Sequence, residues 1–357
     1  SETFGSSLSS LIVQPESLHQ DLNRFDCIID VRSPAEFSLD HIPGAINCPV
    51  LSNEERAQVG MIYKQESPFA AKKIGAALVA KNIASHLQDN FLDQERGWTP
   101  LVYCWRGGQR SGSFSSILAQ IGWRTDKIAG GYQAFRRLVY DAVYQADLPH
   151  RFVLLDGFTG TAKTEILNRL PDHGVQVIDL EGMARHRGSL LGAMPGGQPT
   201  QKSFETALAC ALARLDPTRP VVLEAESSKI GRLIVPPSVW AGMARAKRIE
   251  ITASPEARAR YLTGTYADII SDPERLAARL DSLRQFRGHE VVDHWMALYA
   301  AGDHVGLAGA LIHDHYDPAY AKSRGARTSA IVAQVDAGEL DAAALDKAAQ
   351  EVAAKAG

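Results

Sequence analysis

Cysteine is scarce in this chain of 357 residues, which contains four. The four, Cys27, Cys48, Cys104 and Cys210, are widely separated and form no Cys-x-x-Cys pair. This spacing argues against a disulfide framework and supplies no ligand set for a structural zinc or a metal cluster. In a reducing compartment all four are free thiols, so a reactive one is available for chemistry.

Long apolar runs and a strong charge of one sign are also missing. No apolar stretch is long enough to span a bilayer, and the first residues, SETFGSSLSSLIVQPESL, lack the features of a signal peptide. We therefore expect a cytoplasmic protein with no membrane partner. The net charge of -3 gives no overall indication of nucleic-acid binding. Residues 151–290 carry 19 Lys and Arg against 16 Asp and Glu, an excess that an RNA surface and a solvated face explain equally well.

Two series of alternating strand and helix patterns predict an α/β protein with two parallel-sheet domains. In the first, residues 27–31 and 101–104 are strands, and residues 51–98 between them form a helical insertion packed against the sheet. The second begins with RFVLLDG and continues with VQVIDLEG and RPVVLEAES, separated by helices. The expected parts are a first domain (1–148), a second domain (149–252), its helical lobe (253–324) and a polar Ala-rich tail (325–357), which is a surface helix or a disordered segment.

The strand that ends at Cys104 leads into a glycine-rich turn and a helix. Backbone N–H groups around Gly107 and Gly108, with the helix N-terminus, stabilise negative charge at one place, and Arg106 and Arg110 add positive charge. Such a loop favours a thiolate, so Cys104 is the candidate nucleophile toward sulfur, selenium or phosphorus. The other three cysteines lie in apolar contexts and are interpreted as core residues.

Upstream of this loop, DVRSPAEF (30–37) followed by HIPGA (41–45) resembles the signature of the rhodanese domain. Asp40 stands where that signature usually has glycine. The resemblance implies that Cys104 carries a persulfide or its selenium counterpart. It implies a scaffold role for three charged residues, Asp30, Arg32 and Glu36. The spacing from Cys104 to Arg110 also fits the Cys-x5-Arg loop of cysteine-dependent phosphatases, the alternative for this domain, although a phosphatase would not require the second domain.

Residues GFTGTAKT (157–164) follow a buried strand and open a helix, which is the context expected of a Walker A phosphate loop. Its backbone N–H groups would wrap a diphosphate, Lys163 would neutralise it, and the Thr164 hydroxyl would hold Mg²⁺. Ala162 stands where the motif has glycine, and its methyl group restricts the turn. The predicted diphosphate-binding residues of the loop are Gly157, Thr159, Gly160, Thr161, Ala162, Lys163 and Thr164.

Two pairs of carboxylates follow the next strands, Asp179 with Glu181 and Glu224 with Glu226. Because the carboxyl ends of parallel strands meet at the ligand crevice, Asp179 and Glu224 are further candidates for the diphosphate site. Capping of the following helix is the alternative role for each carboxylate.

Five further segments extend the resemblance to about residue 324: NEERAQVGMIYK, DLEGMARHRGS, QPTQKSFE, EAESSKIG and HYDPAY. With the two loops they resemble the tRNA 2-selenouridine synthase family, in which a rhodanese domain is fused to a P-loop domain. The resemblance implies a transferase of selenium-containing groups that also has tRNA geranyltransferase activity. Geranyl diphosphate S-geranylates the wobble 2-thiouridine, and selenium from selenophosphate then replaces the geranylthio group. The implied partners are tRNAs for Lys, Glu and Gln and a supplier of selenophosphate. We expect no tightly bound cofactor, and Thr164 is a candidate ligand for Mg²⁺.

Basic residues of two segments are candidates for tRNA contacts: Arg185, His186, Arg187, Arg275 and Arg279. A solvated helix face explains the second segment as well. Trp105 is a candidate for stacking on a base, although packing beside the strand is its alternative role. Two other functions stay open from the residues alone, a sulfurtransferase or phosphatase coupled to a nucleotide-binding domain and a non-enzymatic RNA-binding protein. The intact Cys104 loop counts against the latter.

Overall fold

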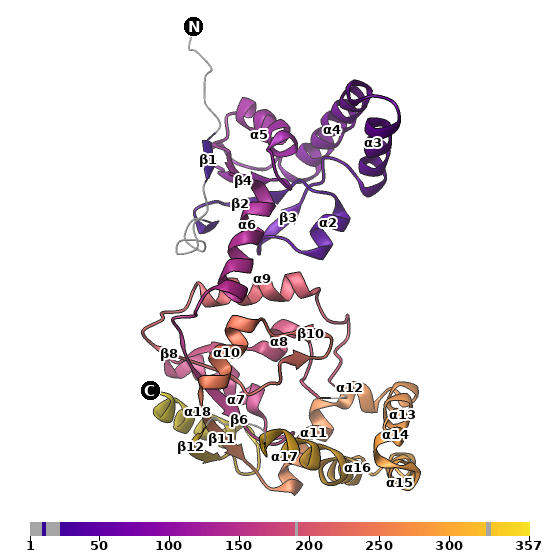
Figure 1. Cartoon of the computed structure of the whole chain (residues 1–357), viewed down its shortest axis with the longest axis vertical. Helices are drawn as coiled ribbons and strands as arrows, with labels where there is room; N and C mark the ends of the chain where they lie inside the picture. Colours follow the sequence, from indigo (N-terminus) through magenta and orange to yellow (C-terminus); the bar gives the residue numbers. More distant parts are fainter. Residues whose placement is uncertain (1–8, 12–21, 190–191, 326–329) are drawn as a thin grey trace. The chain divides into compact units, whose positions relative to one another are not determined.

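The computed structural model describes residues 9–11, 22–189, 192–325 and 330–357. They form two compact units, and each contains a sheet of parallel strands covered by helices (Figure 1). One unit holds the described residues up to Ala146 together with Thr200–Arg214, and the other holds Asp147–Pro199 and Leu215–Gly357. The predicted α/β class is confirmed.

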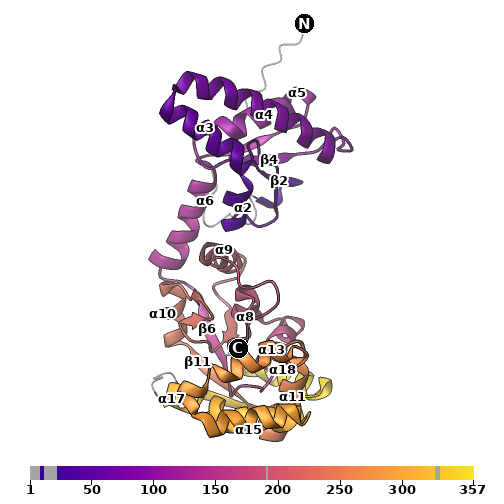
Figure 2. The same ribbon diagram turned by 90° about the vertical axis from the view of Figure 1, so that its right-hand side faces the viewer.

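The first sheet has the strand order β1-β5-β4-β2-β3, and all neighbouring strands are parallel. Residues 51–98 contain the helix pair α3 and α4 (Figure 2), and Ile83 of α4 is buried in the same core as Val102 and Phe114. The strands are β1 (Ser9–Leu11), β2 (Cys27–Asp30), β3 (Ala45–Asn47), β4 (Pro100–Tyr103) and β5 (Asp126–Ile128). The helices are α2 (Pro34–Leu39), α3 (Asn53–Gln65), α4 (Pro68–Asn90), α5 (Gln109–Ile121), α6 (Gly131–Tyr140) and a π-helical continuation of α6 (Asp141–Gln145).

Helix α9 (Gln201–Leu212) belongs to the first unit, although its sequence falls inside the predicted second domain. Its buried polar side chains explain this position. Glu205 forms an ion pair with Arg136 of α6, and the Thr206 hydroxyl donates to a carboxylate oxygen of the buried Asp40 at 2.8 Å. Asp40, which replaces the usual glycine of the rhodanese signature, therefore supplies an anchor for α9.

The second sheet has the order β12-β11-β6-β8-β7 and is also parallel throughout. Its centre is apolar on both faces, as expected when helices cover a parallel sheet. Its strands are β6 (Arg151–Asp156), β7 (Gln176–Ile178), β8 (Pro220–Glu224), β11 (Lys247–Thr252) and β12 (Ile331–Asp336), and a small hairpin adds β9 (Lys229–Ile230) and β10 (Leu233–Ile234). Its helices include α7 (Lys163–Arg169), a 3₁₀ turn (Leu170–His173), α8 (Leu180–Ala184), α10 (Pro237–Arg245) and α18 (Ala342–Ala356).

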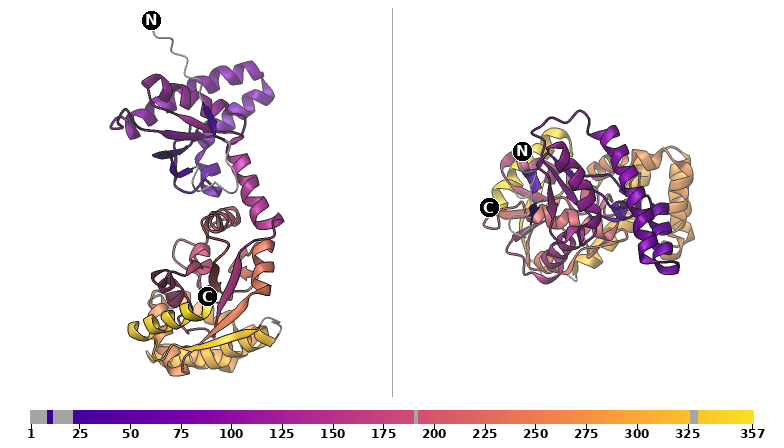
Figure 3. Two further views of the ribbon diagram at one scale, coloured as in Figure 1. Left: turned by 90° about the vertical axis from the view of Figure 1, so that its left-hand side faces the viewer. Right: turned by 90° about the horizontal axis from the view of Figure 1, so that it is seen from above.

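The C-terminal segment is not the polar tail that its composition suggested. Strand β12 pairs with β11 at one edge of the second sheet, and α18 packs against the same core (Figure 3). Leu345 and Val352 of α18 are buried with alanines between them. Alanine lets a helix pack close to a sheet but adds little apolar character to the sequence. The Ala-rich composition therefore did not indicate that this segment forms a core helix. The expectation that strands end near residue 253 was therefore wrong.

The predicted lobe consists of short helices around Trp295, whose side chain is fully buried with Leu280 and Val292. The helices are α11 (Pro255–Thr265), α12 (Ala267–Ile270), α13 (Pro273–Asp281), α14 (Arg284–Arg287), α15 (His289–Ala300), α16 (His304–Leu311), a π-helix (Ile312–Tyr316) and α17 (Asp317–Gly325). Among the described residues, no helix has the length and apolar character needed to cross a membrane.

Candidate functional site

Cys104 lies at the carboxyl end of β4, where the chain turns into α5. Its thiol is 3.5 Å from the carbonyl oxygen of Arg106, and the Ser111 hydroxyl, in the first turn of α5, donates to the sulfur at 3.4 Å. Gly107 and Gly108 have φ angles of +75° and +77°, a conformation that favours glycine. The turn therefore places the sulfur at the N-terminus of a helix, which stabilises an anion.

The two arginines of the loop have different surroundings. Nη1 of Arg110 lies 3.2 Å from a carboxylate oxygen of Glu36 in α2. Burial raises the pKa of Glu36, but Arg110 and the backbone N–H of Ser33 outweigh that effect, and the net pKa is lowered. Arg110 thus ties the loop to α2, whereas Arg106 is exposed and has no ion pair within the described part of the chain.

The proposed scaffold residues lie beneath this loop. Arg32 donates to both carboxylate oxygens of Asp30 at 2.6–3.1 Å, and both side chains are buried. The guanidinium carbon of Arg32 is also 3.9 Å from the centre of the Tyr132 ring. Asp30 and Arg32 are thus paired with each other. This agrees with a structural role at the end of β2.

Cys27, Cys48 and Cys210 are poor nucleophiles in this structure. Burial raises their pKa values to about 11, 12 and 11 respectively, and nearby acidic groups or thiols add to the effect. A thiol is nucleophilic only as the thiolate. The interpretation of these three as core residues agrees with their positions.

The phosphate loop follows β6 and ends at Ala162, the residue before α7. Lys163 Nζ lies 2.8 Å from the carbonyl oxygen of Gly157 and 3.2 Å from that of Phe158, so its ammonium group crosses the loop. Ala162 has φ of +56°, where a residue with a Cβ costs about 1–2 kcal/mol relative to glycine. Its methyl group packs in the core of the unit, which offsets part of that cost.

Four carboxylates line the cavity beside the loop, Glu165, Asp179, Glu181 and Glu226, and Glu224 is not among them. Asp179 caps α8 by accepting from the Gly182 N–H, although it also reaches the cavity wall. Glu224 is fully buried, accepts from the Leu180 N–H at 3.1 Å and does not line the cavity. The structure thus gives Glu224 the alternative role, in which its carboxylate stabilises the start of α8.

Two of the cavity carboxylates, Glu181 and Glu226, lie close to each other and to the loop. The Thr164 hydroxyl donates to Glu181 at 3.0 Å. A Cβ at Gly188 would lie 2.3 Å from an oxygen of Glu181 and 2.8 Å from one of Glu226, so both carboxylates face the backbone there. Burial and the charge of Glu226 raise the pKa of Glu181 to about 8. Two carboxylates held this close disfavour the ionised form of one of them.

Residues far along the chain brace the phosphate loop. The Arg258 guanidinium donates to the Thr159 carbonyl at 2.9 Å and forms a paired contact with Asp317 at 2.6 and 3.0 Å. The Tyr320 hydroxyl bonds to Asp156, the last residue of β6. Sequence reasoning did not predict these contacts. Asp317 and Tyr320 lie in the HYDPAY segment, and its polar residues were the feature of the sequence that could have indicated a contact with the phosphate loop.

The cavity has a volume of about 500 Å³ and lies beside the whole phosphate loop. Both glycines of the loop, Lys163 and Thr164 line one side, and residues of α11 line the other. Aromatic and apolar side chains also line the cavity: Tyr261, Leu262 and Tyr266. Leu262 lies against Gly160 of the loop, and the Tyr261 hydroxyl donates to Glu165 at 2.9 Å, so charged and apolar groups lie side by side in the wall.

Comparison with known proteins agrees with this arrangement. The model of the tRNA 2-selenouridine synthase AAA domain matches residues 150–289, and that of the rhodanese-like domain matches residues 14–138. A tRNA 2-selenouridine synthase from Hahella chejuensis is 32% identical over 339 residues, covering 87% of this chain and 88% of the relative. The chain belongs to the tRNA 2-selenouridine synthase family. Another member, from Alcanivorax borkumensis, is 32% identical over 86% of this chain and 92% of its own length. A rhodanese-related protein from Thermoplasma volcanium is 20% identical over 36% of this chain and 91% of its own, with a TM-score of 0.23.

In this member of the family, the basic residues predicted to contact tRNA have mixed roles. Arg185 donates to the Pro195 carbonyl and Arg275 to the Ala193 carbonyl, so both hold the segment after α8. Arg187 pairs with an aspartate on α12, and both it and His186 line the phosphate-loop cavity. Burial lowers the pKa of His186, and the charges of Arg279 and Arg187 add to this. The structure therefore brings His186 and Arg187 to the cavity beside the phosphate loop.

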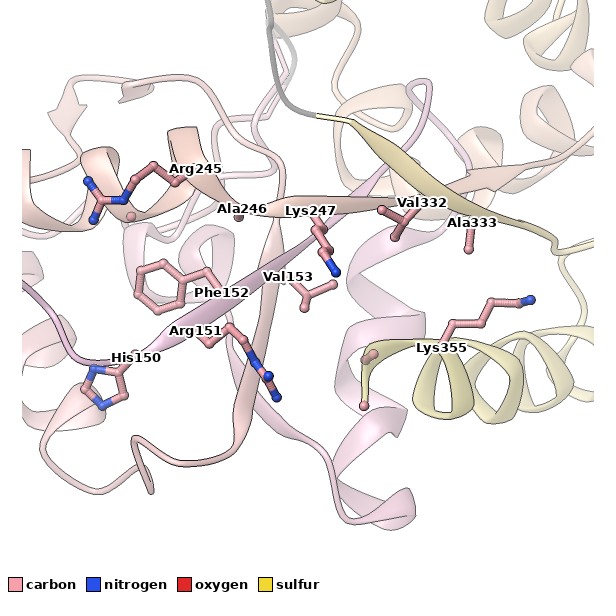
Figure 4. Close-up of a pocket in the computed structure, with 13 residues that line it drawn as sticks. His150, Arg151, Phe152, Val153, Arg245, Ala246, Lys247, Val332, Ala333 and Lys355 are labelled. Carbon is pink, nitrogen blue, oxygen red and sulfur yellow. The ribbon is translucent and has the colours of Figure 1, made fainter.

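A second cavity of about 570 Å³ lies where β6 and β11 begin, at the opposite end of the strands from the phosphate loop (Figure 4). Its wall contains basic residues and no Asp or Glu: His150, Arg151, Arg245, Lys247 and Lys355. Arg245 lies in the last turn of α10 and Lys355 in that of α18. Cations at these positions offset the partial negative charge of helix C-termini. The helix ends therefore explain part of this positive charge and disfavour a bound anion.

Proposed function

We propose that this protein converts the wobble 2-thiouridine of tRNAs for Lys, Glu and Gln into 2-selenouridine through an S-geranyl intermediate. Geranyl diphosphate and selenophosphate are the proposed co-substrates. Family membership supports the tRNA product, since the relatives carry the name tRNA 2-selenouridine synthase. The observation that carries the two-step chemistry is the presence of two complete anion-binding loops, one with a nucleophilic cysteine and one of the diphosphate type.

The phosphate loop is assigned to the geranyl step. The 2-thio sulfur attacks C1 of geranyl diphosphate, a C–S bond forms, the C–O bond breaks, and the uridine loses its N3 proton to water. Charge then develops on the leaving diphosphate. Lys163, which lies within 3.2 Å of two loop carbonyls, is placed to neutralise it, and the N-terminus of α7 adds backbone N–H donors.

The residues present at this site fit Mg²⁺. Thr164 and the carboxylates of Glu181 and Glu226 are oxygen donors of the kind that this ion prefers. Burial and, after it, the charge of Glu226 raise the pKa of Glu181, and a divalent cation would offset both effects. When bound, Mg²⁺ would supply further positive charge to the diphosphate. Arg258 and Asp317 keep the loop in place for both ligands.

Cys104 is assigned to the selenium step. Its thiolate attacks the phosphorus of selenophosphate, so that an S–P bond forms, the P–Se bond breaks and a hydrogen selenide ion leaves. Water hydrolyses the thiophosphate to phosphate and the free thiol. The hydrogen selenide ion attacks C2 of the geranylated base, the C2–S bond breaks, and geranylthiol leaves with the proton. This route uses no oxidant, which formation of a selenylsulfide on Cys104 would require.

The test is mass spectrometry of the wobble nucleoside. The protein is incubated with 2-thiolated tRNA and geranyl diphosphate, and selenophosphate is added in a second reaction. We expect the geranylated nucleoside after the first incubation and 2-selenouridine after the second. An unchanged nucleoside in every combination refutes the proposal. Thiosulfate turnover or phosphatase activity that is independent of tRNA would favour the alternative enzyme classes.

A further inference from the structure

The first unit contains a small cavity beside the Cys104 loop that none of these steps uses. We call it the α6 pocket. Its volume is about 280 Å³, and it is lined by Trp105, Tyr132, Gln133, Arg136, Arg137, Tyr140 and Lys202. The spacing of 133, 136, 137 and 140 places four of these residues on one face of α6. Lys202 comes from α9, which belongs to the same unit.

The pocket lies directly next to the nucleophile. Trp105 follows Cys104 in the chain, and the N–H of Tyr132 donates to the Cys104 carbonyl at 2.8 Å. The N–H of Gln133 donates to the Trp105 carbonyl at 3.0 Å. The N-terminus of α6 is thus hydrogen-bonded to the cysteine loop. A ligand bound along the first turns of α6 would therefore lie beside this loop.

Two aromatic side chains in the wall are exposed to solvent. Trp105 is 39% exposed and Tyr140 is 44% exposed. The Trp105 ring centre lies 5.4 Å from that of Tyr132, and Tyr140 stacks on Tyr144 at 4.6 Å. These contacts hold one face of each ring against the protein, which prepares the other for a planar ligand. Nucleobases stack on such rings whatever their sequence.

The cations of the pocket are not all accounted for by the fold. Arg136 is neutralised by the buried Glu205. Arg137 and Lys202 are exposed, and neither has an ion pair within the described residues. Lys202 also lies in the first turn of α9, where the helix dipole disfavours a cation. Lys202 is therefore a cation that no carboxylate of the described residues neutralises, and it is available to an anionic ligand.

We infer that the α6 pocket binds a nucleotide of the substrate RNA strand next to the base that receives the selenium released at Cys104. The base stacks on Trp105 and Tyr140, and its phosphates contact Arg137 and Lys202. This inference rests on the proposed function, because it takes an RNA strand as the ligand. Single-stranded RNA is recognised by this combination of aromatic rings and basic side chains.

The experiment measures binding of a fluorescent anticodon stem-loop RNA by anisotropy between about 50 and 200 mM salt. The variants are Trp105→Ala, Arg137→Glu and Lys202→Glu. Lys72→Glu, at an exposed position of α4 outside the pocket, makes the same charge change and is the matched control. We expect each pocket charge reversal to weaken binding about tenfold and to lower the salt slope by about 0.7–1. Trp105→Ala should weaken binding about fivefold to a hundredfold with little change of slope.

Ultraviolet crosslinking and peptide mass spectrometry give an independent readout, and we expect crosslinks at Trp105 or Tyr140. If the unaltered protein does not bind RNA at all, the proposed function fails and the pocket inference fails with it. If it binds, but the pocket variants behave like Lys72→Glu and no crosslink falls on α6, the inference fails while the proposed function stands. Lys247→Glu, in the wall of the second cavity, is a further variant, and a loss of binding confined to it would place the RNA there and overturn the inference. Circular dichroism of each variant checks that it is folded.

Discussion

Replacement of Glu181 by glutamine should change how the stability of the second unit depends on pH. In the structure, burial and the neighbouring Glu226 raise the pKa of Glu181 from 4.5 to about 8. The folded unit therefore binds a proton that the unfolded chain releases throughout this range. Glutamine has the same shape, keeps an acceptor for the Thr164 hydroxyl and cannot ionise.

The sign and size follow from proton linkage. The contribution of Glu181 to stability is greatest below its ordinary pKa of 4.5 and declines as the pH rises toward about 8, because ionisation is costlier in the folded state. One extra proton in the folded state corresponds to a slope of about -1.4 kcal/mol per pH unit. When the pH rises from 6 to 7, the free energy of unfolding of the unaltered protein should fall by on the order of 1 kcal/mol more than that of the Glu181→Gln variant. Burial also raises the pKa of Glu224, and the charges of Asp179 and Glu181 add to this effect, so the variant removes one contribution to that shift as well.

The assay is urea unfolding, without Mg²⁺ or diphosphate, at several pH values between about 5 and 8. The quantity compared is the slope of the unfolding free energy against pH for the transition of the second unit. Glu274→Gln, at an exposed position of α13, is the matched control and should keep the original slope. Equal slopes for the protein and for Glu181→Gln would show that Glu181 does not hold the extra proton. The argument that Glu181 and Glu226 bind a cation would then be refuted.

The remaining predictions concern the two loops and α9. Cys104→Ser should stop selenium incorporation but leave geranylation, and Lys163→Ala should stop geranylation, both measured by nucleoside mass spectrometry; selenouridine formed by the serine variant would exclude Cys104 from that step. Asp317→Asn removes the charged partner of the buried Arg258 and should weaken pyrophosphate binding about tenfold in calorimetry while costing the second unit about 2 kcal/mol; unchanged affinity would mean that this pair does not shape the loop. Thr206→Val removes a donor to the buried Asp40 and should destabilise the first unit by about 1–3 kcal/mol in urea unfolding, so an unchanged midpoint would contradict the proposed anchor.

Both reactive loops were predictable because their chemistry is local. A cysteine at a strand end, a glycine-rich turn and a Lys-Thr pair opening a helix are properties of short segments, and the structure has Cys104 after β4 and before α5 and has Lys163 and Thr164 at the start of α7. Even the tolerance of Ala162 was foreseeable, since its cost is a property of one residue. The predicted strands and helices of both sheets follow from apolar periodicity for the same reason.

Choices between similar side chains were not predictable. The carboxylates Glu224 and Glu226 stand two positions apart, yet one is buried against a helix start and the other lines the cavity. Which carboxylate reaches the ligand depends on the direction of the chain after β8, and a residue pattern does not encode that direction. The same holds for Arg258 and Asp317, whose contact joins segments 59 positions apart.

The position of α9 and of the C-terminal segment shows where local information ends. Periodicity identifies α9 as a helix, but its assignment to the first unit depends on whether Glu205 and Thr206 find partners there, and those partners, Arg136 and Asp40, come from distant parts of the chain. The alanines of α18 are likewise core residues only because the helix packs against the second sheet. The order of residues establishes which elements form and which loops carry chemistry. Burial of polar and small side chains, a property of the assembled fold, establishes where those elements lie and which charges remain for a ligand.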